Sequence, residues 1–139
     1  MAYTRATQAL TDAAVLAMLD AAQIKATSMG QPQCIVICDT SAVLLGCLRM
    51  AGARVLSMKS ATTKAQTAAS TGNPSGAVPE AVKVTIALAT GGSVTGLPGG
   101  LPIQVGGVLV GGIGVGSGTG AQDEEVARAA LAAIAADPV

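Results

Sequence analysis

The chain has 139 residues and a mass of 13.4 kDa, and we expect residues 1–139 to form one domain. Half of its residues are hydrophobic, only 12% are charged, and the formal net charge is zero. Such a sparse, balanced charge set offers no basic surface for nucleic acid or an anionic membrane. No apolar run reaches the roughly 18 residues that a membrane span requires. The low charge and a mean hydropathy of +0.58 predict a homo-oligomer, in which subunits cover apolar surface.

Aromatic residues are almost absent from the chain, and histidine is wholly absent. Tyr3 is the only aromatic residue, so the chain has no stacking platform for bases or flat rings. The sequence contains no His, which is the commonest metal ligand, general base and axial ligand of haem. We therefore expect neither a metal site nor a metalloenzyme.

The three cysteines are Cys34, Cys38 and Cys47. Cys34 and Cys38 are about 13 Å apart if they lie on one strand at about 3.3 Å per residue, too far for a disulfide. An odd number of thiols and no recognisable signal peptide indicate the reducing cytoplasm. We interpret the thiols as small buried apolar groups, with a nucleophilic or redox-sensing thiol as the alternative.

The first half of the chain predicts a helix followed by a β-hairpin. Apolar residues recur at helical spacing from Thr11 to Met29, and Gly30-Gln31-Pro32 ends the helix. A short buried strand over 34–38 and a second strand over 43–50 flank the turn 39–42.

The second half predicts two helices, a second hairpin and a last helix. Helical stretches cover 57–71 and 79–89, and strands cover 102–105 and 108–115 around the turn Gly106-Gly107. The acidic run Asp123-Glu124-Glu125 opens the last helix. The order α-β-β-α-α-β-β-α, with hairpins in place of crossovers, predicts an α/β (α+β) fold with an antiparallel sheet flanked by helices.

The glycines between Gly112 and Gly120 do not form a nucleotide-binding motif. They alternate with other residues, whereas a dinucleotide site has G-x-G-x-x-G followed by a full βαβ unit, and no P-loop Lys-Ser/Thr is present. Glycines in a strand permit close approach of another backbone. We leave two interpretations open: packing against helices or subunits, and close approach of a ligand.

Lys64 is the first candidate for a functional side chain. It lies among alanines in the helix predicted over 57–71, and Ser60 and Thr67 share its face. One interpretation is a solvated surface lysine. The other is a cation directed at a ligand carboxylate, or a desolvated amine that acts as a base.

The first hairpin supplies further candidates. Asp39 opens the turn and is either a turn residue or a catalytic carboxylate. Arg49 could pair with Asp39 or with a ligand anion, and Met50 is either core filler or, in principle, a metal ligand.

Several of these segments together resemble the GlcG/HbpS family, over about residues 10–134. The segments are Val36–Asp39, Leu48–Ala53, Lys64–Ala68, Gly72–Gly76, Gly99–Ile103, Gly112–Gly116 and Gln122–Ala127. The resemblance implies a profilin-like fold and a compact homo-oligomer. It also implies haem or a related tetrapyrrole as a candidate ligand.

The sequence departs from the family pattern at the first hairpin. The usual Asp-x-Gly-Gly turn reads Asp39-Thr40-Ser41-Ala42, and the usual Arg-Met-Asp-Gly reads Arg49-Met50-Ala51-Gly52. The absence of His weighs against ordinary haem ligation, so we expect no cofactor.

Two functions are compatible with these residues. The first is a binding protein that holds a small metabolite at a subunit boundary, between the Lys64 helix, the Asp39 turn and the Gly99-Gly100 loop. The second is a cofactor-independent isomerase, lyase or hydratase acting on a small carbonyl or carboxylate compound. Its base would be Lys64 or Asp39, and backbone N–H groups near Gly99, Gly100 or Gly116 would stabilise an oxyanion.

Overall fold

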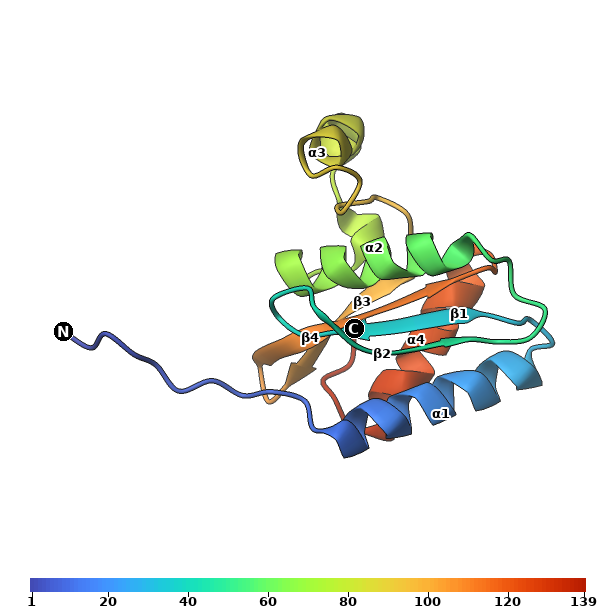
Figure 1. The fold of residues 1–139 in the computed structure, drawn as a ribbon, viewed down its shortest axis with the longest axis horizontal. Coiled ribbons are helices and arrows are strands. Elements are labelled where there is room, and N and C mark those ends of the chain that lie inside the picture. Colours follow the sequence, from blue (N-terminus) through green and yellow to red (C-terminus); the bar gives the residue numbers. More distant parts are fainter.

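A four-stranded antiparallel sheet forms the centre of the molecule (Figure 1). The computed structural model describes all residues from 1 to 139. The strands lie in the order β2-β1-β4-β3, which confirms an antiparallel sheet built from two hairpins. Their bounds are β1 Cys34–Cys38, β2 Leu44–Arg49, β3 Gly100–Val105 and β4 Val108–Gly116.

Helices cover both faces of this sheet. In Figure 1, α2 lies on one face, and α1 and α4 lie on the other. The remaining helix, α3, stands away from the sheet. The helices are α1 Asp12–Ser28, α2 Ser57–Thr71, α3 Lys83–Ala89 and α4 Gly120–Ala133, with short 3₁₀ turns η1 Ser75–Ala77 and η2 Glu80–Val82.

The strand β1 is buried along its whole length because both of its faces are covered. Ile35 and Ile37 join the core beneath α1 and α4, whereas Cys34, Val36 and Cys38 pack against α2. Burial raises the pKa of the Cys34 thiol, and it raises the pKa of Cys38 to about 11. These two thiols therefore lie in the sheet as small apolar side chains, protonated at neutral pH. For Cys47 the expected burial is wrong, because this residue is exposed on β2.

The glycines of β4 let α2 lie almost directly on the sheet. A Cβ at Gly114 would overlap the carbonyl oxygen of Ala61, and one at Gly112 would overlap that of Ala65. The facing side of α2 is made of small residues, chiefly alanine. The structure therefore supports the helix-packing interpretation of this glycine series.

The last helix begins earlier than the acidic run suggested. It starts at Gly120, and the Thr119 side chain accepts a hydrogen bond from the Gln122 backbone N–H while the Gln122 side chain bonds back to Thr119. This reciprocal capping box satisfies N–H groups at the helix start. The expected start at Asp123 is thus wrong, because the neighbouring glycines masked the cap.

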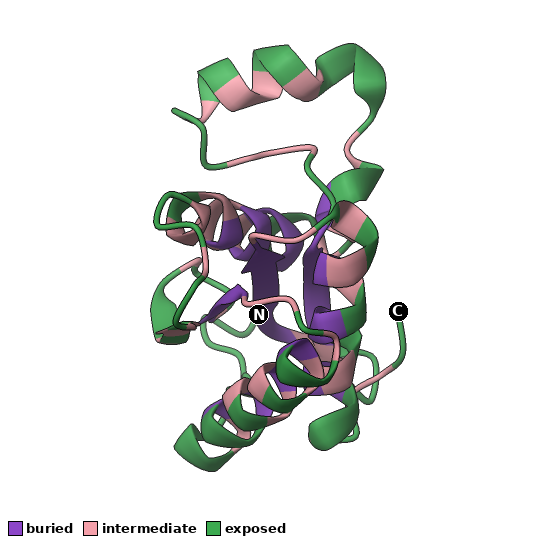
Figure 2. Cartoon of the chain, turned by 90° about the vertical axis from the view of Figure 1, so that its right-hand side faces the viewer, coloured by how far each residue is buried: buried purple, intermediate pink, exposed green.

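Residues 75–97 form an arm that projects from the body of the molecule (Figures 1 and 2). The stretch predicted as one helix over 79–89 is divided between η2 and α3. No residue from 76 to 97 is buried. The only element that α3 packs against to any extent is the adjacent η2. The arm therefore contributes little to the core.

Candidate functional site

Lys64 is buried in the interior and does not lie on the surface. Its ammonium lies 2.9 Å from Oδ2 of Asp123 and donates a hydrogen bond of 2.8 Å to the carbonyl oxygen of Val115. Its relative exposure is 5%. The surface interpretation of Lys64 is wrong, because the glycine-lined contact with β4 draws this face of α2 into the protein.

Asp123, the partner of Lys64, was not among the residues selected from sequence. It lies in the first turn of α4, where its Oδ1 also accepts a 3.0 Å hydrogen bond from the Gly118 backbone N–H. A carboxylate at this end of a helix is stabilised by the helix dipole. Reading Thr119 and Gln122 as a capping box would have placed Asp123 on the same inner face as Val126 and Ala127.

Gln33 is a second buried polar residue that sequence reasoning missed. It is fully buried, and neither its side-chain oxygen nor its nitrogen has a hydrogen-bond partner within the chain. A Cβ at Gly118 would lie 2.7 Å from the Gln33 Nε2 and 2.9 Å from Oδ1 of Asp123. Lys64, Asp123 and Gln33 therefore belong to one polar cluster at the end of β4.

The Gly99-Gly100 loop adjoins this cluster, as expected from the sequence. A Cβ at Gly99 would lie 3.0 Å from the Lys64 ammonium nitrogen. The Gly100 N–H donates a 2.8 Å hydrogen bond to the Ser75 hydroxyl, which itself donates to the Leu97 carbonyl at 2.6 Å. These contacts fix the loop at the base of the arm.

The other candidates on α2 are also held by internal contacts. The Ser60 hydroxyl donates to the Ser57 carbonyl at 3.2 Å, and Gly116 lies against these two serines. Thr67 is fully buried, donates to the Thr63 carbonyl at 2.7 Å and accepts from the Thr95 N–H at 3.0 Å. Thr67 therefore ties the arm to the body.

The structure does not bring the candidates of the first hairpin to Lys64. Oδ1 of Asp39 accepts hydrogen bonds from the backbone N–H groups of Ser41 and Val43, at 2.8 and 3.0 Å, which is a turn role. The strand register pairs Ile35 with Val115, so Asp39 lies four residues, or about 13 Å, along β1 from the level of the Lys64 ammonium. Within one chain the Asp39 turn therefore does not lie beside Lys64, and the pocket expected at a subunit boundary stays a prediction.

Arg49 and Met50 lie at the opposite end of that hairpin from Asp39. Arg49 is exposed and pairs in register with Cys34, so the suggested Asp39–Arg49 ion pair is wrong. The sulfur of Met50 accepts a hydrogen bond of 3.4 Å from the Gln33 N–H, and the side chain packs against the core. Neither residue lines a cavity with Lys64.

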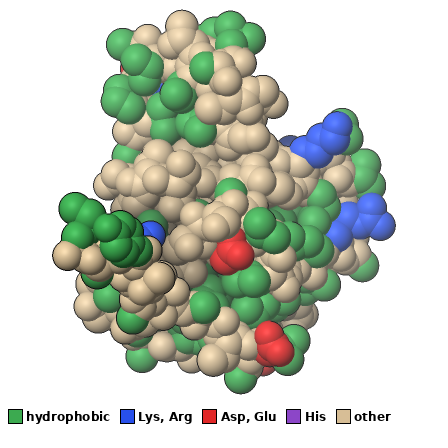
Figure 3. Space-filling model, turned by 60° about the vertical axis from the view of Figure 1, so that its left-hand side comes forward, with side chains coloured by type: hydrophobic (Ala, Val, Ile, Leu, Met, Phe, Trp, Pro, Cys, Tyr) green, Lys and Arg blue, Asp and Glu red, His purple; other side chains and the backbone are tan.

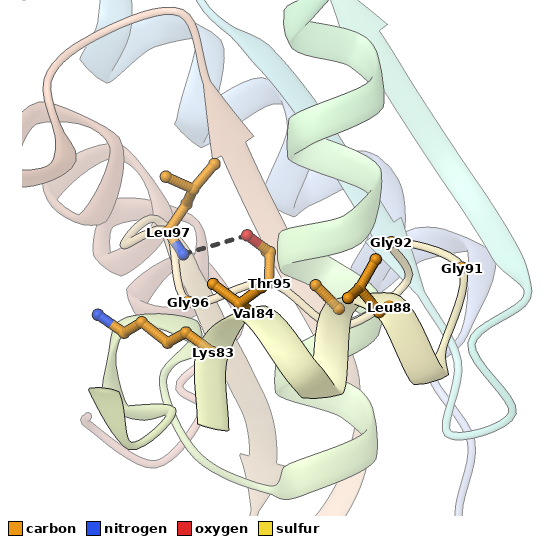
Figure 4. A pocket seen from close by; sticks show the side chains of 9 residues that line it. Lys83, Val84, Leu88, Gly91, Gly92, Thr95, Gly96 and Leu97 are labelled. Carbon is orange, nitrogen blue, oxygen red and sulfur yellow. Dashed lines mark hydrogen bonds between the residues drawn. The ribbon is translucent and has the colours of Figure 1, made fainter. Parts of the chain in front are cut away.

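A hollow of about 550 Å³ lies instead between α3 and residues 91–97 (Figure 4). Val84, Ala87, Leu88 and Leu97 give it an apolar lining, and the Thr95 hydroxyl accepts a 3.2 Å hydrogen bond from the Leu97 N–H. Gly91, Gly92 and Gly96 complete the lining with backbone.

Lys83 is the only charged residue of this hollow. A Cβ at Gly96 would collide with its methylene stem, so the side chain lies along the glycine backbone (Figure 4). Its ammonium is 2.7 Å from Oε2 of Glu80, whose side chain is largely exposed. Because an exposed pair of this kind is weak, Lys83 can exchange Glu80 for another anion at little cost.

Comparison with known proteins identifies the family. A family model described as "Haem degrading protein HbpS-like" matches residues 10–132. The chain belongs to the HbpS-like family. This confirms the resemblance seen in the sequence motifs. A search of curated proteins gave no significant match.

Solved structures of similar sequence extend this HbpS-like assignment. The chain is 27% identical to Klebsiella pneumoniae protein ORFY, with a TM-score of 0.92 and 97% of each chain covered. A PduOC–haem complex shows 26% identity and a TM-score of 0.87, over 94% of this chain and 99% of that one. A double mutant of Streptomyces reticuli HbpS shows 31% identity and a TM-score of 0.83, over 93% of this chain and 89% of that one.

The residues of this HbpS-like chain do not fit haem, the group its family description names. The hollow offers only Lys83 and Thr95 as side-chain donors, and Lys83 is paired with Glu80. Lys64 and Met50 are bonded in the interior, away from the hollow. A second copy of the chain would bring no imidazole either, because the sequence contains no His. The imidazole that most commonly ligates haem iron is therefore lacking.

The groups required by a cofactor-independent enzyme are bonded within the chain. The Lys64 ammonium is paired with Asp123, and Oδ1 of Asp39 accepts two turn hydrogen bonds. The Gly100 N–H, a candidate oxyanion donor, donates to Ser75. The structure contains no cluster of three or more His, Cys, Asp or Glu side chains suited to a metal ion. None of its helices has the length and apolarity to cross a bilayer.

Proposed function

We propose that this HbpS-like protein is a small-ligand-binding protein and that its ligand occupies the hollow between α3 and residues 91–97. The observation that carries the proposal is the lining of this hollow, which sets the Lys83 ammonium and the Thr95 hydroxyl beside four apolar side chains. Its volume of about 550 Å³ falls within the roughly 300–1,000 Å³ typical of small-molecule sites. Such sites combine apolar walls with a few polar groups, as this one does.

The lining supports one class of ligand. Leu88, Val84 and Leu97 suit a short apolar body, while the Thr95 hydroxyl and the Lys83 ammonium suit a carboxylate or carbonyl group. The best fit is therefore a small amphipathic acid or carbonyl compound. The haem complex of PduOC supports ligand binding as a property of similar proteins, but the donor set here favours a ligand without iron.

Homo-oligomer formation is part of this proposal. The chain exposes many large apolar side chains, including Leu16 of α1, Leu44 of β2 and Leu88 of α3. Exposed apolar surface of this extent is typical of proteins that associate. A subunit partner would cover it and enclose the ligand more fully.

Fluorescence binding tests the site directly. Anilinonaphthalene sulfonate serves as an amphipathic anionic probe, and short-chain hydroxy- and keto-carboxylates serve as competitors. Ala87→Phe fills the hollow and should reduce probe affinity at least about tenfold, which is about 1.4 kcal/mol. Ala89→Phe is the matched control on the same helix, since Ala89 does not line the hollow.

Two results would overturn the proposal. One is a probe affinity that Ala87→Phe leaves unchanged; the other is no binding of the probe or of any competitor. Lys83→Ala should weaken the carboxylates more than neutral analogues. Haemin should give no saturable one-to-one complex, and a six-coordinate spectrum would contradict the choice of an iron-free ligand.

A further inference from the structure

A second hollow lies on the other side of the arm, between α3 and the C-terminal end of α2. Its volume is about 590 Å³, and it shares no lining residue with the hollow of Figure 4. Both volumes fall in the range of roughly 300–1,000 Å³ that is typical of small-molecule sites. Figure 3 shows apolar side chains gathered on the arm, the projecting part of the molecule.

The helix α3 forms one wall of each hollow. Val82, Ile86 and Thr90 follow each other at intervals of four residues and line the second hollow. Val84 and Leu88 also lie four residues apart, but they are offset by two residues and line the first hollow. Two residues correspond to about 200° around an α-helix, so the two sets occupy opposite faces of α3.

The lining of the second hollow contains no charged side chain. Its walls are mainly aliphatic side chains and two prolines, and its polar members are Ser70, Thr71, Asn73 and Thr90. The first hollow, by contrast, contains the Lys83 ammonium. The two hollows therefore differ in the charge that they present to a ligand.

Two of the polar groups remain for a ligand. The hydroxyls of Thr71 and Thr90 donate to carbonyl oxygens one turn earlier along the chain, at 2.9 and 2.7 Å. Nδ2 of Asn73 donates to the Thr71 carbonyl at 3.0 Å, so Oδ1 of Asn73 is left as an acceptor. Ser70 is exposed at the end of α2, and its hydroxyl can donate or accept.

The electrostatics of this end of α2 favour a hydrogen-bond donor over an anion. Ser70 and Thr71 belong to the last turn of the helix, whose terminal carbonyl groups carry partial negative charge. No basic residue lies in that turn. A carboxylate here would meet the helix terminus and Oδ1 of Asn73 without a counter-charge, whereas a hydroxyl or amide N–H would donate to Oδ1.

We propose that the second hollow is a separate binding site for uncharged compounds that combine an apolar body with a hydrogen-bond donor, such as short-chain alcohols, diols and primary amides. The apolar body packs against Val82 and Ile86, and the donor binds Oδ1 of Asn73. This site lies apart from the acid-binding site of the proposed function. The arm thus takes a different class of ligand on each face of α3.

Fluorescence titration with 2-naphthol tests the second hollow. This compound is an uncharged aromatic alcohol near neutral pH, and 2-naphthoate carries a carboxylate on the same rings. Ala77→Phe fills the second hollow and should weaken 2-naphthol binding at least about tenfold, which is about 1.4 kcal/mol. Ala81→Phe in η2 is the matched control, because Ala81 is also exposed but does not line the hollow. Circular dichroism of each variant should match that of the native protein.

Asn73→Ala tests the role of the donor. Loss of Oδ1 should weaken 2-naphthol binding about threefold to tenfold, the usual contribution of one hydrogen bond. The binding of 2-methylnaphthalene, which has no donor, should not change. In Ala87→Phe, where the first hollow is filled, 2-naphthoate should bind at least about tenfold more weakly than 2-naphthol.

The proposal is wrong if the native protein does not bind 2-naphthol, or if Ala77→Phe and Ala81→Phe bind it equally well. Equal affinities of Ala87→Phe for 2-naphthol and 2-naphthoate contradict the preference for uncharged ligands. An equal loss of 2-methylnaphthalene binding in Asn73→Ala contradicts the role of Oδ1.

The two binding sites fail independently. If 2-naphthol binds as expected but anilinonaphthalene sulfonate and the carboxylates do not bind, the proposed function is wrong while the second site stands. If Ala87→Phe weakens anilinonaphthalene sulfonate binding but Ala77→Phe leaves 2-naphthol binding unchanged, the second site is wrong while the proposed function stands.

Discussion

The helices α2 and α3 follow each other along the chain but are stabilised in opposite ways. The inner face of α2 lies on the glycines of β4, with Ala61 and Ala65 fully buried. No residue of α3 is buried. The first helix is fixed by close backbone packing, whereas the second exposes its apolar side chains. Rigid support and exposed apolar surface are thus divided between neighbouring segments.

This difference changes how the polar residues of the two regions are interpreted. The ion pair of Lys64 with Asp123 lies beneath α2, where both side chains are almost completely excluded from water. The pair of Lys83 with Glu80 lies on the arm and is solvated. Loss of one partner from a buried ion pair destabilises the folded protein, because the other charge is left buried and unpaired. An exposed charge can exchange partners at little cost. We therefore expect the first lysine to stabilise the fold, and the second is the one assigned to the proposed ligand.

Breaking the buried pair should have the largest effect. Lys64→Ala leaves the Asp123 carboxylate buried without a counter-charge, and it should cost about 3–5 kcal/mol of unfolding free energy in urea titrations. Lys59→Ala, at an exposed position on the same helix, should change stability by less than about 0.5 kcal/mol. Lys64→Met/Asp123→Leu should recover much of the loss. Equal stabilities for the two single lysine variants would contradict a structural ion pair.

Disturbing the contact between α2 and β4 should have the next largest effect. Gly114→Ala places a methyl group against the Ala61 carbonyl, and the forced separation should cost about 2–3 kcal/mol. Ala89→Val adds bulk to the exposed arm helix and should cost less than about 0.7 kcal/mol. Thermal unfolding of both variants measures the difference. A smaller loss at Gly114 than at Ala89 would show that the contact is not tight.

Removing the hydrogen bond that joins Thr67 of α2 to Thr95 of the arm should have an intermediate effect on stability. Thr67→Val removes the acceptor of the Thr95 N–H, and an unpaired buried N–H costs about 1–2 kcal/mol. It should also weaken probe binding, because Thr95 lines the hollow. Thr62→Val is the control, since the Thr62 hydroxyl bonds only the Met58 carbonyl of its own helix. If Thr67→Val binds the probe as the native protein does, the hydrogen bond between Thr67 and Thr95 does not contribute to the site.

Cysteine labelling should distinguish the buried sheet from its edge without altering stability. Burial raises the pKa of Cys38 to about 11 and also raises that of Cys34, so neither forms appreciable thiolate near neutral pH. Cys47 is exposed on the edge strand β2. Iodoacetamide should therefore modify one thiol of the folded protein, as counted by mass spectrometry, and none in Cys47→Ser. Labelling of Cys34 or Cys38 before unfolding would contradict their burial.

The sequence by itself determined the elements, the antiparallel hairpins and the family, because these depend on local periodicity, turn residues and ordered motifs. The strand over 34–38 and the helix over 57–71 were predicted at their observed bounds. The start of α4 was misplaced because glycines on both sides of Thr119 obscured a local signal that was present.

Only the tertiary structure decided which side chains meet. Lys64 and Asp123 are 59 residues apart, and no periodicity reports that they form a pair. Asp39 and Lys64 were both expected to line one pocket, yet the strand register separates them by four residues along the sheet. The hollow was also invisible in the sequence, because it depends on how far α3 stands from the body. Local patterns fix local geometry, whereas a site is formed by long-range packing that single-residue preferences do not encode.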